Sequence, residues 1–101
     1  MLKHIVMWTV VEEFEGQTKA QIIENMRTQL SGLQAEISEI NALEVGVNCI
    51  VSDAAYDVVL VIIFNDQTAL DVYLKHPAHV KVADYIGKVR KDRVVVDYIV
   101  S

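Results

Sequence analysis

Residues 73–86, which read YLKHPAHVKVADYI, contain two of the three histidines of the chain. His76 and His79 are three positions apart with Pro77 between them, and Tyr73 precedes the second histidine by six positions. An imidazole can bind a metal ion or transfer a proton near pH 7, and a phenol can donate a hydrogen bond to a substrate oxygen. The segment is therefore compatible with a metal site, an acid/base pair or a junction between two helices.

The proline favours the junction. A residue before proline is disfavoured in the α region, and proline is well suited to the first position of a helix. We therefore expect one helix to end at His76 and another to run from Pro77 to about Val89, with His76 capping or flanking the junction and pointing to solvent. A zinc site formed by His76 and His79 is disfavoured, because no nearby cysteine or carboxylate completes a tetrahedral set.

Tyr73 and His79 form the candidate catalytic pair. His79 would lie in the first turn of its helix, where the helix dipole favours a neutral imidazole that can act as a base. Tyr73 would lie on the last turn of the preceding helix, so the bend can bring both groups to one ligand. The structural alternative is that His79 bonds a backbone carbonyl and Tyr73 packs with its hydroxyl satisfied, as buried polar groups usually are.

The elements that must position these residues can be predicted from the periodicity of apolar residues. A helix opens at Thr18, with Gln21 in capping-box spacing, and ends between Ser31 and Ser38. The helix that carries Tyr73 begins at Asp66 or Thr68. β-branched and large apolar residues predict four strands, at residues 3–11, 41–51, 56–64 and 92–100.

The order strand, helix, strand, strand, helix pair, strand predicts an α+β fold. We expect a ferredoxin-like βαββαβ protomer, a four-stranded antiparallel sheet with the helices on one face. We expect the 101 residues to form a single domain, 1–101. Gly46 lies within the second strand and marks either a bulge or a close approach of two backbones. The turn between the second and third strands is short enough for a hairpin.

Both faces of the predicted third strand are apolar. Val58, Leu60, Ile62 and Phe64 line one face, and the three residues between them line the other. A sheet face open to water normally alternates apolar with polar residues, and an exposed apolar patch of this size favours association. We expect a homodimer whose two sheets pack face to face; the alternative is a monomer with an exposed apolar sheet.

Composition argues against several classes of function. Nine Lys and Arg against fourteen Asp and Glu give a net charge of -5, which argues against nucleic-acid binding. The longest apolar run, Val58–Phe64, is too short to span a membrane, and no signal peptide is evident. Cys49 is a single cysteine, expected to be buried and inert, and a cytoplasmic location is predicted. The chain has no G-x-G-x-x-G or P-loop motif, so no nucleotide cofactor is expected.

Five segments together resemble the Dabb family, the stress-responsive dimeric α/β-barrel domain. They are KHIVMW at the start, LEVGVN at 43–48, AYDVVLVIIF at 55–64, YLKHPAHVKVADYI at 73–86 and RVVVDYIV at 93–100. The resemblance covers nearly the whole chain and implies a ferredoxin-like protomer that dimerises into a barrel between two sheets. Some plant members are polyketide cyclases that use a tyrosine and a histidine in a pocket between helices and sheet.

That cyclase pattern matches Tyr73, His79 and His4. From the residues alone, His4 on an apolar strand face is more often a satisfied core residue. The sequence departs from the cyclase pattern at two positions, with Val58 in place of a histidine and Leu30 in place of a tyrosine. A pocket walled by Leu30, Val58 and Leu60 would be more apolar than the cyclase pocket, and this puts cyclase activity in doubt.

The resemblance also suggests an incidental metal site. Some members hold Mg²⁺ on backbone carbonyls at positions matching Gln34, Ile37 and Ile40. Neither Asp97 nor Asp57 has a second carboxylate at a spacing that would suit a two-carboxylate mechanism. Asp97 is expected on the face opposite Tyr98 and is a candidate for a hydrogen bond across a dimer. Asp57 is a candidate for the same kind of bond.

The function that follows from these residues is a homodimer with a small, largely apolar pocket in each protomer. It would bind a mostly apolar molecule with one or two oxygens and, if it is an enzyme, transfer a proton next to a carbonyl without a cofactor, in aldol or cyclase-like chemistry. One alternative is a non-catalytic, stress-related structural dimer. The other is a cofactor-free oxygenase of the dimeric α/β-barrel group.

Overall fold

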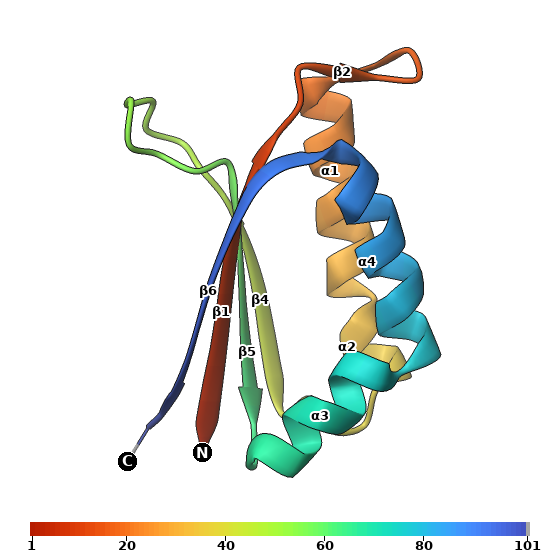
Figure 1. Ribbon diagram of the computed structural model, residues 1–101, viewed down its shortest axis with the longest axis vertical. Coiled ribbons are helices and arrows are strands. Elements are labelled where there is room, and N and C mark those ends of the chain that lie inside the picture. Colours follow the sequence, from red (N-terminus) through yellow and green to blue (C-terminus); the bar gives the residue numbers. More distant parts are fainter. Residues whose placement is uncertain (101) are drawn as a thin grey trace.

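The computed structural model describes residues 1–100. One antiparallel sheet has the strand order β4-β5-β1-β6, in which the strands are β4 (Ala42–Val47), β5 (Val58–Phe64), β1 (Leu2–Val10) and β6 (Arg90–Ile99). The helices are α1 (Lys19–Ser31), α2 (Leu33–Glu36), α3 (Gln67–Lys75) and α4 (Pro77–Val89). Figure 1 shows α1 and α4 lying side by side against one face of the sheet, with α3 across one end of that layer. The predicted ferredoxin-like α+β fold is confirmed.

The helix starts follow the capping signals of the sequence. The Gln21 amide donates to Thr18 Oγ1 at 3.3 Å while Gln21 Oε1 accepts from the Thr18 amide at 2.9 Å, which is the capping box. Asp66 caps α3 by accepting from the Ala69 amide at 2.9 Å. His76 separates α3 from α4, and its Nδ1 accepts from the Ala78 amide at 3.0 Å. The predicted proline junction is therefore confirmed, with His76 as a half-buried cap.

The register of β1 decides which residues share the helix-covered face. His4 pairs with Ile62 on β5 and with Asp97 on β6, while Trp8 pairs with Val58 and Arg93. Directly paired residues of antiparallel strands point to the same face. The side chains of this face on β1 and β5 form the core with the helices, and Val58, Leu60, Ile62 and Phe64 are each at most 2% exposed.

The other face of the sheet has no helix over it (Figure 1). Val59, Val61 and Ile63 of β5 are only partly buried. The β6 residues Val94, Val96 and Tyr98 are 39%, 52% and 43% exposed. We call the side of the sheet that carries these β5 and β6 residues the open face. It is apolar, as the sequence of β5 predicted.

The strand predicted at 41–51 is wrong at its C-terminal end. Pairing with β5 ends at Val47, opposite Val58, and the Asn48 amide then donates to the Asp57 carbonyl at 2.9 Å. Residues 48–57 form a longer connection than the predicted hairpin, and they carry Cys49 into solvent, where it is exposed rather than buried. Gly46 is a close approach, since an added Cβ would lie 2.9 Å from Val59 Cγ1.

A small hairpin between β1 and α1 was not predicted. β2 (Glu13–Phe14) pairs with β3 (Gln17–Thr18) through a two-residue turn. Glu15 and Gly16 both have positive φ angles, 49° and 81°, as the favoured two-residue hairpin turn requires. No helix in residues 1–100 is both long and apolar enough to cross a membrane.

Candidate functional site

A cavity of about 340 Å³ lies between the sheet and the helices. Five of the residues predicted from the sequence line it: His4, Leu30, Leu60, Tyr73 and His79. They come from β1, α1, β5, α3 and α4, so the cavity draws on nearly every element of the protomer. The remaining lining is mostly apolar apart from two arginines.

Val58 does not line this cavity. It shares the helix-covered face of β5 with Leu60. It is the first residue of β5, opposite Trp8 in the last residue pair between β1 and β5, and is 2% exposed. Its side chain packs into the core. We therefore leave Val58 out of the candidate site.

Tyr73 and His79 lie close together across the helix junction. Their ring centroids are 4.4 Å apart, at an interplanar angle of 49°. His79 Nδ1 is 3.1 Å from the Leu74 carbonyl oxygen. Because a carbonyl can only accept, Nδ1 carries the proton, and in the neutral ring Nε2 keeps its lone pair free to accept one. The backbone bond that the structural alternative expected is therefore present, and it also sets the tautomer that a base requires.

Burial is the largest cause of the lowered pKa of His79. The Leu74 carbonyl opposes this effect by stabilising the protonated ring, while electrostatic repulsion between that ring and His4, Arg93 and His76 lowers the pKa further. The sequence predicted a neutral imidazole from the helix dipole. The lowered pKa of His79 agrees with that prediction, but its main cause is desolvation. Desolvation depends on how α4 packs, which the sequence does not specify.

The lowered pKa predicts how stability depends on pH. In the unfolded chain His79 titrates near its ordinary value of 6.5, so as the pH falls the unfolded chain takes up the proton first. The stability contributed by the neutral ring is present above about pH 6.5 and is lost as the pH falls toward the pKa of the folded protein. We expect the melting temperature to fall more between pH 7.5 and 5.5 in wild type than in His79→Asn, which keeps a donor for Leu74. Thermal denaturation followed by circular dichroism measures this, and equal falls would contradict it.

Tyr73 presents a protonated hydroxyl to the cavity. The residue is 1% exposed, and burial raises the pKa of its phenol well above the ordinary value, although the charge of Arg93 opposes the shift. The ring packs against Phe64 with centroids 5.1 Å apart. Nearby, His4 binds Asp97 and His79 binds the Leu74 carbonyl, so these two acceptors are engaged by the histidines rather than by the Tyr73 hydroxyl. The hydroxyl can therefore donate to a ligand oxygen.

His4 is held by an acidic partner within the same protomer. Its Nδ1 donates to Asp97 Oδ1 at 2.5 Å, across the paired strands β1 and β6. The hydrogen bond that we expected Asp97 to make across a dimer is therefore wrong, because Asp97 faces the helix side. Asp57 is also engaged internally, accepting from the Val10 amide at 2.8 Å and lying 3.2 Å from Lys19 Nζ. His4 is 4% exposed and still lines the cavity, with its ring 6.0 Å from that of Tyr73.

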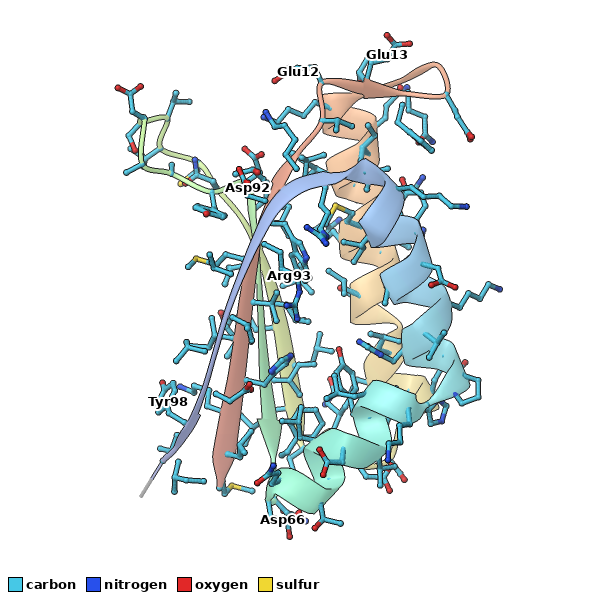
Figure 2. The ribbon with its side chains drawn as sticks, in the orientation of Figure 1. Glu12, Glu13, Asp66, Asp92, Arg93 and Tyr98 are labelled. Atoms are coloured by element: carbon cyan, nitrogen blue, oxygen red, sulfur yellow. The ribbon has the colours of Figure 1, made fainter. Side chains whose placement is uncertain are left out.

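Sequence analysis missed the two arginines of the cavity, Arg90 and Arg93. Figure 2 shows Arg93 pointing from β6 toward the helices, while Tyr98 lies on the other side of the sheet. Arg93 shares a face with Asp97, four positions away, so the two-residue period of a strand contained the signal.

The metal hypotheses gain no support from the geometry. No three His, Cys, Asp or Glu side chains gather into a possible metal site in the described part of the chain. Of the carbonyl set suggested by the resemblance, Gln34 lies in α2, and the Ile37 oxygen accepts from the Ile40 amide at 3.2 Å. Magnesium binding at Gln34, Ile37 and Ile40 stays a prediction.

The four-stranded antiparallel sheet, with helices on one face, defines a ferredoxin-like α+β domain. The family model described as Stress responsive A/B Barrel Domain, Dabb, matches residues 2–100, and the chain belongs to this family. No curated protein has a significant match to the sequence.

Solved structures agree with this assignment. A dimeric protein of unknown function with a ferredoxin-like fold from Bacteroides fragilis is 26% identical, with a TM-score of 0.83 over 96% of this chain and 93% of the other. A dimeric ferredoxin-like protein of unknown function from a Jannaschia species is 27% identical, with a TM-score of 0.75 and 98% of each chain covered. The hydroxynitrile lyase of Passiflora edulis has a TM-score of 0.80 over 99% of this chain and 93% of its own, but at 15% identity it shows the fold alone.

Proposed function

We propose that the protein is a homodimer whose protomers each bind a small, mostly apolar carbonyl compound and transfer a proton next to the carbonyl. The observation that carries this proposal is the pair formed by His79, a neutral base with Nε2 free, and Tyr73, a protonated donor, with rings 4.4 Å apart on one cavity. A cytoplasmic location and a role in stress responses stay predictions.

The size and lining of the cavity support ligand binding over the non-catalytic alternative. In a purely structural dimer the space between helices and sheet would be filled, whereas sites for small molecules begin at roughly 300 Å³. The cavity of about 340 Å³ is above that limit. Leu30 and Leu60 supply apolar walls, so the ligand would be held mainly by apolar contact and oriented by the few polar groups.

The residues present are sufficient for a cofactor-free proton transfer. His79 Nε2 would take a proton from the carbon next to the carbonyl, and the electron pair of that C–H bond would move into the carbonyl to form an enolate. Tyr73 would donate a hydrogen bond to the enolate oxygen, where negative charge develops. Return of the proton to carbon, or attack of the enolate carbon on a second carbonyl, would complete the reaction.

The open face supports the homodimer. Packing two copies of this surface would remove its apolar side chains from water, and the related proteins from Bacteroides fragilis and Jannaschia are described as dimeric. Figure 1 shows the connection between β4 and β5 projecting on the side of the sheet away from the helices. That connection carries Ile50 and Val51, which are 72% and 96% exposed, so it would reach toward the second copy.

Deuterium exchange tests the proposed reaction directly. Phenylacetone, incubated with the protein in deuterated buffer and followed by proton NMR, should lose its α-proton signals faster than in buffer alone. Tyr73→Phe should lower the enzymatic exchange rate by about 10²-fold, as loss of one donor to an oxyanion does. Tyr85→Phe is the matched control, because Tyr85 Oη lies outside the cavity and has no partner in residues 1–100.

Two results would contradict the proposal: exchange no faster than in buffer, or equal loss in both tyrosine variants. The cofactor-free oxygenase alternative makes a different prediction, namely oxygen consumption with an electron-rich phenol. An oxygen electrode with a panel of quinols measures it on the same preparation.

A further inference from the structure

We infer that the ligand of this cavity carries a carboxylate, and that Arg93 binds it. The inference rests on the proposed function and narrows its substrate class to small oxo acids: an apolar body, a carbonyl for Tyr73 and His79, and a carboxylate for the arginine. Nothing in the family assignment or in the related structures specifies such a ligand.

Arg93 is placed by the register of β6. It pairs with Trp8 on the helix-covered face, on which His4 also lies, and it lines the cavity. Figure 2 shows its side chain extending into the space between sheet and helices. Arg93 is exposed, as residues of an edge strand often are, and it also borders the candidate site.

Among residues 1–100, no acidic side chain forms an ion pair with the guanidinium. The ion pairs of the described residues join His4 to Asp97, Lys19 to Glu12 and Asp57, and Arg27 to Glu24, and none includes Arg93. The acid nearest to it on the same strand face, Asp97, is already hydrogen-bonded to His4. Arg93 therefore keeps its planar set of donors free for a ligand, and a carboxylate is the small group that matches that set with two parallel hydrogen bonds.

The sign of charge in the cavity is opposite to that of the whole protein. The chain has a net charge of -5, yet the cavity is lined by Arg90 and Arg93 and by no Asp or Glu. A concave site with low-dielectric walls and one sign of charge concentrates ions of the other sign. An anion would thus be attracted to this cavity and repelled by most of the remaining surface.

The arginine also lies near the reacting groups. Arg93, Tyr73 and His79 all line the one cavity of about 340 Å³. One small molecule can therefore place a carboxylate at Arg93 and a carbonyl at the Tyr73–His79 pair. Arg90 begins β6 and lines the same cavity, where it adds a second positive charge.

The test compares 3-benzoylpropionate with 3-benzoylpropionamide, which share the phenyl ketone and differ in the carboxylate. Isothermal titration calorimetry should give an affinity of wild type for the acid about tenfold higher than for the amide. In Arg93→Gln the two affinities should agree within about twofold, with that for the amide unchanged. Lys91→Gln removes one positive charge from the same strand outside the cavity and should keep the tenfold difference.

The outcomes separate this inference from the proposed function. Equal affinities for acid and amide in wild type, or a tenfold difference that survives Arg93→Gln, would overturn the inference while leaving ketone binding intact. If phenylacetone and the amide both fail to bind and to exchange, the proposed function fails and the inference fails with it. If the preference for the acid disappears equally in Arg93→Gln and Lys91→Gln, then it arises from the overall charge of the protein. That result would also overturn the assignment of the carboxylate to Arg93.

Discussion

Replacing His79 with asparagine is expected to lower the enzymatic exchange of α-protons of phenylacetone by about 10²–10⁴-fold, the contribution of a positioned general base. The asparagine amide keeps a donor for the Leu74 carbonyl, which His79 Nδ1 bonds at 3.1 Å, so the helix junction should be preserved. What is lost is the free lone pair of Nε2, which no other group at that position supplies. Proton NMR in deuterated buffer measures the rate, and the circular dichroism spectrum checks the fold.

The matched control is His76→Asn. His76 is three positions away and its Nδ1 caps α4, a role that asparagine fills well, but it does not line the cavity. Exchange by His76→Asn should equal that of wild type. If both histidine variants lose exchange equally, or if His79→Asn retains it, then His79 is not the base.

The pH profile gives the same prediction an independent readout. A base works in its neutral form, and burial holds the pKa of His79 below its ordinary value of 6.5. The exchange rate should therefore be constant at high pH and fall to half only at a pH below 6.5, as the pH passes through the lowered pKa. A rate that halves at or above pH 6.5 would show that a different group carries the reaction.

Val61→Asp is expected to dissociate the homodimer. Val61 lies in the middle of the open face, opposite Ile5 on one neighbouring strand and Glu44 on the other. In a face-to-face dimer the new carboxylate would be removed from water, once in each protomer, directly opposite the existing acid Glu44. Leaving a charge buried and unpaired costs several kcal/mol, so we expect the dissociation constant to rise by about 10²–10³-fold or more. Sedimentation velocity over a range of concentrations measures it.

Val72→Asp provides the comparison, because Val72 is on α3 and is already 43% exposed. It adds the same charge to the chain away from the open face and should leave the dimer unchanged. Circular dichroism and urea unfolding would establish that the Val61→Asp monomer is folded. A Val61→Asp dimer that sediments as wild type would mean that the two sheets do not pack through this face.

Local patterns in the sequence predicted most of the fold because the forces that start and stop elements are local. The Thr18–Gln21 capping box joins residues three apart, and the proline junction depends on the sterics of His76 and Pro77 alone. The apolar content of both faces of β5 similarly predicted a sheet with one face against helices and the other packed on a second copy, and the structure shows β5 buried on the first face and partly buried on the second.

Errors appeared where an element's extent depends on a partner strand. The end of β4 at Val47 is decided by the last rung of pairing with β5, and the residues beyond it have enough β propensity to look like a strand. Cys49 was misplaced for the same reason. Propensity describes which residues tolerate an extended backbone, but pairing decides which of them have a neighbour.

The sequence by itself determined the class of fold and the helix junction. Together with the family resemblance it also predicted three polar residues that line the cavity, His4, Tyr73 and His79. Only the tertiary structure decided how they act together. The bond from His4 to Asp97 joins residues 93 positions apart, and it reassigned Asp97 from a dimer contact to the helix-covered face. The same register brought Arg93 to the cavity, and the packing of α4 lowered the pKa of His79 by burial. Strand register and burial are relations between distant segments, so the residue types along one chain do not specify them until the sheet is assembled.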